Sequence, residues 1–289
     1  MRIFALELNN DIKGIEIRKQ YIENLISKLP SPDLVVLPEL AMCSYIANQE
    51  IWQYADSCGK DTKSWAMQMA AKYNTYIGVG YLDRENRDYY NRYLVAGKDD
   101  VYGVISKSEG ESAVFKRGYF DNIIKTPFGN VAVGICYDSR RKHLYDNIKD
   151  VELSMILFPH GCPADPKKPD EEQTTIDYFC GCYEDAFSVP VVYVNSVGKL
   201  EDMPGVMGKM MKKQGFTMNG KSKIYSRNSE PIYCESNAII GANIIILPQK
   251  RIKEIHFHGE DIIRGNWFFR TFVLIPDTKK QLKSYEENR

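Results

Sequence analysis

Short apolar segments alternate with amphipathic ones along most of the chain. Runs of apolar side chains predict β-strands at 3–8, 34–37, 76–80, 130–136, 155–158 and 189–194. A continuous apolar run is typical of a strand that is covered on both faces. Between these runs, apolar positions with helical periodicity predict helices at 14–29, 62–73, 140–149 and 171–187. This order predicts an α/β fold with one mixed sheet, or two sheets, covered by helices.

The remaining segments complete a single domain. Residues 92–96 and 101–105 predict a hairpin. The stretch 199–215 is rich in Gly, Met and Lys and predicts a mobile loop, after which strands continue to residue 247. No internal repeat or low-complexity linker divides the chain. We therefore expect one domain over residues 1–289, in which the aromatic tail 248–289 forms an extension that contacts a partner subunit.

Composition narrows the classes of partner. The chain has 289 residues, and 44% of them are hydrophobic, which is ordinary for a protein with a sizeable core. Its 38 basic and 38 acidic side chains balance, so no broad positive field favours nucleic acid or an anionic membrane. No apolar run approaches the roughly 20 residues that span a bilayer, and the N-terminus does not resemble a signal peptide. We expect a soluble, cytoplasmic protein with neither nucleic acid nor membrane as a partner.

Seven cysteines occur at irregular spacings. Their odd number and scattered positions argue against a disulfide framework. Cys180 and Cys182 superficially resemble a metal-binding pair, but no second pair follows at zinc-site spacing. The two cysteines fit better within a helix. No metal site is predicted.

One of these cysteines, Cys136, occupies a position suited to catalysis. It ends the apolar run 130–136 and precedes a predicted helix. Ligands of α/β proteins bind at the carboxyl ends of strands, and a nearby helix N-terminus favours the nucleophilic thiolate. A cysteine in such a position is, taken alone, more often a small core residue. Three other polar residues of the chain make a catalytic role for Cys136 the better interpretation.

Three further polar residues follow strands or lie in the loops between them. Glu39 follows the strand that ends at Leu37, Lys107 follows the strand at 101–105, and Glu111 lies in the next loop. A thiol nucleophile needs a base that removes its proton and later activates water, which a carboxylate can supply. The developing oxyanion needs positive charge and N–H donors, which Lys107 and the backbone of Tyr137 can supply.

Three motifs carry these residues in a fixed order. They are Leu37-Pro38-Glu39-Leu40, Gly103-Val104-Ile105-Ser106-Lys107 and Gly134-Ile135-Cys136-Tyr137-Asp138. The ordered set resembles the nitrilase superfamily of carbon–nitrogen hydrolases. Secondary landmarks of that family match at Asn91, at Thr126-Pro127-Phe128-Gly129 and at Asn195 to Gly198, so the resemblance spans about residues 2–247.

The resemblance implies a four-layer αββα sandwich and a triad of Glu39, Lys107 and Cys136 that acts through a thioester. It also implies a second glutamate, for which Glu111 fits the family pattern and Glu109 is the rival. The cysteine supplies covalent catalysis, so no metal or organic cofactor is required. Members of the family form oligomers, and we expect a homodimer or a larger homo-oligomer.

Residues near the triad suggest how substrate binds. Arg140 lies one helical turn after Cys136, where a guanidinium could bind a substrate carboxylate through two hydrogen bonds. Alternatively, Arg140 pairs with an internal acid such as Asp138. Tyr45, after the Glu39 loop, and His160, after the strand at 155–158, are further candidates for lining the pocket, and either could be a packed loop residue.

The predicted activity is hydrolysis of a non-peptide carbon–nitrogen bond in a small amide or carbamoyl compound. Nitrile hydrolysis, acyl transfer on the same triad, and a non-catalytic binding protein that retains the fold remain alternatives. A thiol phosphatase is excluded by Lys142, because its signature requires arginine there. A papain-like protease could use His143 or His160, but the local papain signature is absent.

Overall fold

A computed structural model describes all residues, 1–289. The helical segments are α1 Ile15–Ile26, η1 Gln49–Tyr54, α2 Lys60–Tyr73, η2 Cys136–Arg140, α3 Lys142–Ile148, α4 Pro169–Phe187, α5 Gly205–Gln214, α6 Trp267–Phe269, η3 Arg270–Leu274 and α7 Ile275–Asn288. The strands are β1 Arg2–Leu6, β2 Leu34–Val36, β3 Asp56–Ser57, β4 Tyr76–Glu85, β5 Asp88–Ala96, β6 Val101–Ser106, β7 Ile123–Thr126, β8 Gly129–Val133, β9 Met155–Pro159, β10 Pro163–Ala164, β11 Val191–Val194, β12 Val197–Lys199, β13 Thr217–Asn219, β14 Lys223–Tyr225, β15 Ser229–Ile232 and β16 Ile239–Ile244.

Two large sheets form the centre of the molecule. The first has the order β15-β16-β1-β2-β4-β5-β6, with β3 beside β4. Its strands β1, β2 and β4 are parallel, whereas β16, β5 and β6 pair antiparallel with their neighbours. The second sheet has the order β14-β11-β9-β8-β7, with three parallel strands at its centre. A small third sheet, β10-β13-β12, lies apart from both.

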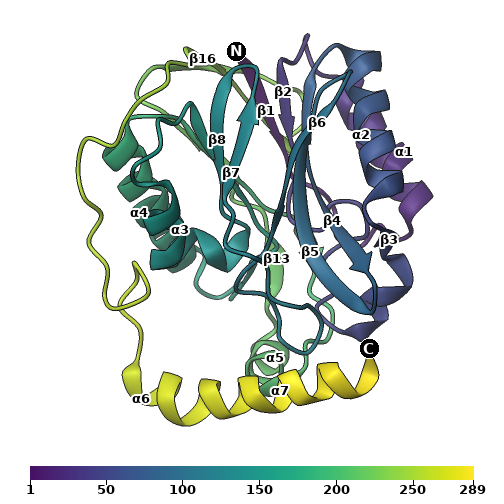
Figure 1. Cartoon of the computed structure of the whole chain (residues 1–289), viewed down its shortest axis with the longest axis vertical. Helices are drawn as coiled ribbons and strands as arrows, with labels where there is room; N and C mark the ends of the chain where they lie inside the picture. The colour runs from purple at the N-terminus through teal and green to yellow at the C-terminus, as the bar shows by residue number, and fades with distance from the viewer.

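The two sheets pack face to face between two pairs of helices (Figure 1). Helices α1 and α2 cover the outer face of the first sheet, and α3 and α4 cover the outer face of the second. The expected four-layer αββα sandwich is therefore confirmed. No helix combines the length and apolar character that crossing a lipid bilayer requires.

Alternation along the strands explains why both faces of each sheet are buried. In β1, Phe4 and Leu6 pack under α1 and α2, whereas Ile3 and Ala5 face the second sheet. Successive side chains of a strand point to opposite faces, so an unbroken apolar run fills two cores at once. In the second sheet, Ile156 of β9 likewise points toward the α3–α4 layer. The continuous apolar pattern of these strands thus follows from the layered packing.

The sandwich brings the ends of several strands together. Strand β6 runs in the same direction as β2 and β4, because it is antiparallel to β5, which is antiparallel to β4. Glu39 follows β2, Lys107 follows β6, Cys136 follows β8 and His160 follows β9. The chain therefore places polar side chains at the carboxyl ends of its strands, where α/β proteins bind ligands.

Two elements differ from the sequence prediction. Strand β8 ends at Val133, and the turn η2 separates it from α3, so the predicted helix 140–149 begins only at Lys142. The backbone of Cys136 has φ 50, a left-handed conformation that interrupts both strand and helix. The predicted mobile loop at 199–215 contains helix α5, which begins after Pro204 and ends at Gly215 with φ 74.

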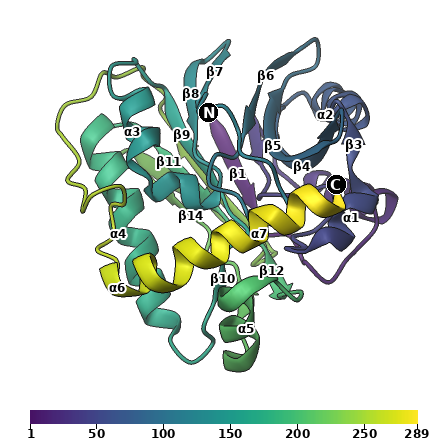
Figure 2. The same cartoon turned by 60° about the horizontal axis from the view of Figure 1, so that its bottom comes forward.

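The C-terminal extension packs on its own chain. Figure 2 shows α7 running across the molecule next to α5. Tyr285 is buried, its ring lies edge-on to Trp52 with centroids 5.9 Å apart, and its hydroxyl donates to Asp88 at 3.2 Å. The backbone N–H of Val206 donates to Asp277 at 2.9 Å. The expected contact of this tail with a partner subunit stays a prediction.

Because Tyr285 is the buried residue of α7, we expect Tyr285→Ala to release this helix from the domain. Truncation of a large buried aromatic costs about 3–5 kcal/mol, which exceeds what the remaining exposed contacts can replace. Hydrogen exchange of residues 275–288 should become fast while exchange in β1 and β9 stays slow. Leu282→Ala, at a position that is 47% exposed, serves as the control and should leave the exchange of α7 unchanged. Unchanged protection of α7 in Tyr285→Ala would contradict this account.

Candidate active site

A cavity of about 220 Å³ opens at the strand ends. Cys136, Glu111, Tyr45 and His160 are among the residues that line it. Apolar side chains form more than half of the lining, including Ile176, Phe179, Tyr193, Met203 and Met211. Met211 belongs to α5, so the segment expected to be a mobile loop forms part of the wall.

The buried ammonium group of Lys107 bridges two carboxylates, one of which, that of Glu111, lines this cavity. Lys107 Nζ lies 2.6 Å from Glu39 Oε1 and 3.2 Å from Glu111 Oε1. Lys107 and Glu39 are each about 1% exposed, so water does not screen their attraction. The structure thus unites Glu39, 68 residues away in the sequence, with Lys107 and Glu111, which lie four residues apart.

Two neutral donors complete this cluster. Asn91 Nδ2 donates to Glu39 Oε1 at 2.7 Å, and the Tyr45 hydroxyl donates to Glu111 Oε1 at 2.6 Å. Tyr45 therefore lies at the site, as predicted. Asn91 was identified from the sequence only as a family landmark. Asn91 is buried in β5, and a buried amide needs a hydrogen-bonding partner.

For both Glu39 and Lys107, burial and the attraction between opposite charges shift the pKa in opposite directions. Burial raises the pKa of Glu39; the Lys107 charge opposes this shift and Glu111 reinforces it. Burial alone would lower the pKa of Lys107, but Glu111 and Glu39 raise it well above its ordinary value. A carboxylate with a raised pKa is a suitable proton acceptor, while the lysine stays a permanent cation.

Cys136 is held in a strained turn above this cluster. Its left-handed backbone costs a non-glycine residue about 1–2 kcal/mol, and such conformations concentrate at functional sites. Burial raises the pKa of the Cys136 thiol, the Glu39 charge raises it further, and Lys107 lowers it. The resting side chain is therefore a thiol, which needs a base before it can attack.

A glycine allows the close packing around Glu39. A side chain at Gly161 would place its Cβ 2.8 Å from Glu39 Oε2 and in collision with the Tyr45 ring. Glu39 Oε2 is buried and has no hydrogen-bond partner in the chain, unlike Oε1. One carboxylate oxygen is thus held by Lys107 and Asn91, and the other remains available to accept a proton.

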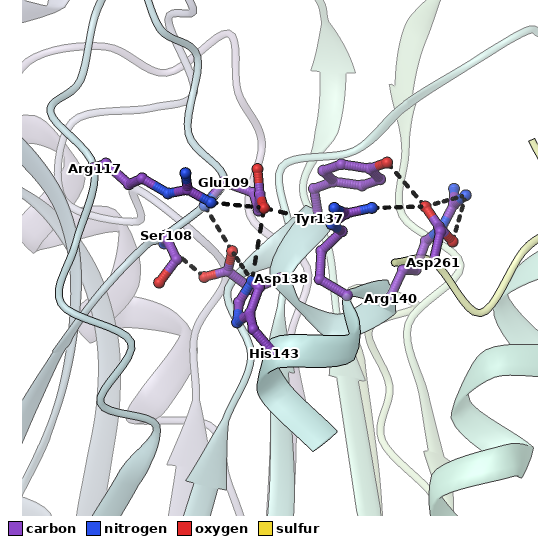
Figure 3. Close-up of polar contacts among 9 residues, drawn as sticks. Ser108, Glu109, Arg117, Tyr137, Asp138, Arg140, His143 and Asp261 are labelled. Atoms are coloured by element: carbon purple, nitrogen blue, oxygen red, sulfur yellow. Dashed lines mark hydrogen bonds and ion pairs between the residues drawn. The ribbon is translucent and has the colours of Figure 1, made fainter. Parts of the chain in front are cut away.

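Asp138 ties the cysteine turn to the lysine loop (Figure 3). Its two carboxylate oxygens accept the backbone N–H groups of Ser108 at 2.8 Å and Glu109 at 2.7 Å. Complete burial raises the pKa of Asp138 to about 7, although these hydrogen bonds and the Lys107 charge oppose the rise. Asp138 therefore fixes the loop after Lys107 relative to Cys136.

Arg140 lines the cavity, but its charge is already paired. Arg140 Nη2 lies 3.1 and 3.2 Å from the two carboxylate oxygens of Asp261, in the C-terminal extension. The Tyr137 hydroxyl donates to the same carboxylate at 2.8 Å (Figure 3). Of the two roles considered for Arg140, pairing with an internal acid is the one observed, with Asp261 in place of Asp138.

The second carboxylate of the cluster is Glu111 rather than Glu109. Glu109 turns away and contacts Arg117 at 3.0 Å and Arg141 at 3.4 Å. Of these two glutamates, only Glu111 contacts Lys107, because the short turn after the lysine brings Glu111 back over it.

His160 forms part of the wall as a neutral ring. It lies 3.2 Å from the Ser139 hydroxyl and packs on Tyr193, with ring centroids 4.5 Å apart. Burial lowers the pKa of His160 well below its ordinary value, and the charges of Lys107 and Arg140 lower it further. The ring therefore contributes shape and hydrogen bonding to the pocket but no charge.

Sequence reasoning missed two polar residues of the cavity. Cys162 lies two residues after His160, and its thiol donates to Glu172 Oε1 at 3.7 Å. Glu172 belongs to the first turn of α4, where acidic residues are common, so nothing in the sequence distinguished it from its neighbours. No group of three or more His, Cys, Asp or Glu side chains is arranged to hold a metal ion.

Comparisons with known proteins bear on the family and the fold. The sequence profile of the carbon-nitrogen hydrolase family matches residues 11–176. A probable nitrilase from Schizosaccharomyces pombe is 27% identical over 138 residues, which cover 45% of this chain and 51% of that protein. The matched part thus spans about half the length of this curated relative.

Solved structures share the fold at low identity. A carbon-nitrogen hydrolase from Helicobacter pylori superposes with a TM-score of 0.66 at 18% identity, covering 78% of this chain and 82% of that one. An amidase from Nesterenkonia sp. gives a TM-score of 0.65 at 15% identity, covering 86% and 91%. These similarities establish a common fold.

Lys107→Met should destabilise the protein by about 3–5 kcal/mol near pH 8, because it leaves two buried carboxylates without their cation. The loss should shrink near pH 5, where one of the carboxylates can take up a proton. Urea unfolding at both pH values measures this effect. Lys168→Met, which removes a solvent-exposed partner of Glu171, should leave stability unchanged. An equal, small loss in both variants would contradict the central role of Lys107.

The raised pKa of Asp138 predicts a specific dependence of stability on pH. Between its ordinary value of 3.8 and about 7, the folded protein binds more protons at this site than the unfolded chain does. The free energy of unfolding of the wild type, relative to Asp138→Asn, should therefore fall as the pH rises across this window and level off above it. Unfolding measured in parallel at several pH values tests this. A difference that stays constant with pH would indicate an unshifted pKa, and one that grows with pH would indicate a pKa lowered by folding; either result would contradict this account.

Proposed function

Because the chain belongs to the carbon-nitrogen hydrolase family, we propose that it hydrolyses a non-peptide carbon–nitrogen bond in a small amide or carbamoyl compound. The observation that carries this proposal is the buried Lys107 ammonium between Glu39 and Glu111, near enough to the Cys136 thiol that the charges of Glu39 and Lys107 both shift its pKa. A binding protein would gain nothing from burying three charges around a thiol, because such a cluster is costly to desolvate.

In the first step, the thiol of Cys136 attacks the carbonyl carbon of the substrate. Glu39 accepts the thiol proton through its free Oε2 and passes it to the leaving nitrogen. Ammonia or an amine leaves, and the acyl group stays on Cys136 as a thioester. The raised pKa of Glu39 supports both transfers, because a weakly basic carboxylate could not hold the proton.

Positive charge stabilises the tetrahedral intermediate. Lys107 remains protonated throughout, since its pKa is raised well above its ordinary value. Its ammonium and the backbone N–H of Tyr137 can hold the oxyanion. Glu111, which accepts hydrogen bonds from both Lys107 and Tyr45, positions the ammonium for this role.

In the second step, Glu39 removes a proton from water, and the hydroxide attacks the thioester carbon. The carboxylic acid leaves, and the proton held by Glu39 returns to the Cys136 sulfur. Splitting the reaction through a covalent intermediate replaces one difficult step with two easier ones. The cavity of about 220 Å³, lined mainly by apolar side chains, supports a small substrate rather than a polypeptide.

Intact mass spectrometry tests the nucleophile. After exposure to a panel of small amides, ureas and nitriles, the wild type should carry a covalent acyl adduct at Cys136 and release ammonia. Cys136→Ala should show neither adduct nor turnover, a loss of at least about 10⁴-fold.

Cys162→Ala is the matched control, because it removes the other thiol of the same cavity. This variant should keep the adduct and most of the activity. Equal turnover by wild type and Cys136→Ala would exclude the proposed mechanism. An acyl adduct found on Cys162 of the wild type, and not on Cys136, would identify Cys162 as the nucleophile and contradict the proposal.

A further inference from the structure

The charged side chains of the cavity are unevenly paired. Three of them line it, namely Glu111, Arg140 and Glu172. Glu111 pairs with Lys107, and Arg140 pairs with Asp261. Glu172 has no ion-pair partner, and the thiol of Cys162 is its only side-chain hydrogen-bond partner. The Arg140 charge acts on Glu172 without contacting it and is itself paired with Asp261. A partly buried carboxylate with no cation in contact is unfavourable unless a ligand supplies the missing charge.

Arg140 cannot readily serve an anionic substrate. Asp261 receives three contacts from its guanidinium, with Nε at 3.3 Å and Nη2 at 3.1 and 3.2 Å. A substrate carboxylate would have to share this guanidinium with Asp261 and approach Glu172, and like charges at such range repel. The pocket therefore disfavours the carboxylate that Arg140 alone would suggest.

The path from Cys136 to Glu172 suits an apolar chain. Both residues line the same cavity, and the Cys162 thiol beside Glu172 lies close enough to raise the pKa of Cys136. Ile176 and Phe179, from the helix that carries Glu172, form part of the wall. Methylene groups of a substrate would pack against these side chains, and a positive end group would meet the carboxylate.

We propose that Glu172 binds a cationic end group of the substrate, a protonated amine or a guanidinium, and thereby determines which amides are cleaved. This inference rests on the proposed function, because it names the substrate class of the same site. The preferred substrate is a short amide or carbamoyl compound whose acyl chain ends in a cation.

The alternative role for Glu172 is to stabilise the N-terminus of α4, and the control variant must separate this role from substrate binding. Acidic residues in the first turn of a helix interact favourably with the helix dipole, and Asp170 and Glu171 occupy the same turn of α4. Glu171 does not line the cavity and pairs with Lys168 in solvent. Glu171→Gln therefore removes the same charge from the same turn without changing the cavity.

The experiment compares three amides of equal chain length that end in an amino, a methyl or a carboxylate group. For the wild type, kcat/KM should be about tenfold to a hundredfold higher for the amino amide than for the alkyl amide, and lowest for the carboxylate. Glu172→Gln should lose this preference, mainly through a higher KM, and should cleave the alkyl amide as the wild type does. Glu171→Gln should keep the full preference.

Several results would overturn the inference. The first is a wild type whose kcat/KM is equal for the amino and alkyl amides, or highest for the carboxylate. The second is a Glu172→Gln variant that loses activity toward all three amides alike. The third is a Glu171→Gln variant that loses the preference as much as Glu172→Gln does. Such results leave the proposed function intact if the amides still acylate Cys136. No adduct on Cys136 with any of the three would instead overturn the proposed function, and this inference with it.

Discussion

The attraction between one buried ammonium and two buried carboxylates is the interaction on which the site depends. Lys107 reaches Glu39 because strands from one sheet end at the same edge, and it reaches Glu111 through the short turn that follows β6. Removing these groups from water is costly, and the attraction between them compensates only when the remaining lone pairs are also satisfied. Asn91 and Tyr45 satisfy two of them. The oxygen without a partner, Glu39 Oε2, is the one that can accept a proton.

The layered fold supplies the rigidity that this cluster needs. The inner faces of the two sheets pack against each other, so the strand ends that carry Glu39 and Cys136 cannot move independently. The left-handed turn at Cys136 is strained and persists because packing on both sides determines it. Asp138, two residues later, transfers this rigidity to the loop after Lys107 through two backbone hydrogen bonds. The nucleophile and the cation are thereby held as one unit.

The sequence pattern predicted the features that depend on neighbouring residues in the chain, namely the buried strands and the motifs of the site. Unbroken apolar runs identified the buried strands, and the ordered motifs around Glu39, Lys107 and Cys136 identified the cluster and the family. Long-range pairing was not predictable, because nothing in the sequence near Arg140 shows that its partner, Asp261, comes from the far end of the chain. Helix α5 was missed for a related reason. Its two glycines, Gly205 and Gly208, favoured the prediction of a loop, whereas the Met, Lys and Gln residues that fill most of the segment favour a helix and contacts with α7 support it.

On the proposed function, the C-terminal extension contributes to specificity as well as to packing. Asp261 belongs to this segment, and its carboxylate neutralises the guanidinium that would otherwise favour anionic substrates. The same segment continues into α7, which packs beside α5 and so supports the wall that contains Met211. Asp261 and α7, which are remote in sequence from the triad, thus affect the charge and shape of the cavity wall. Relatives that share the triad but differ in this extension can consequently differ in the substrates they accept.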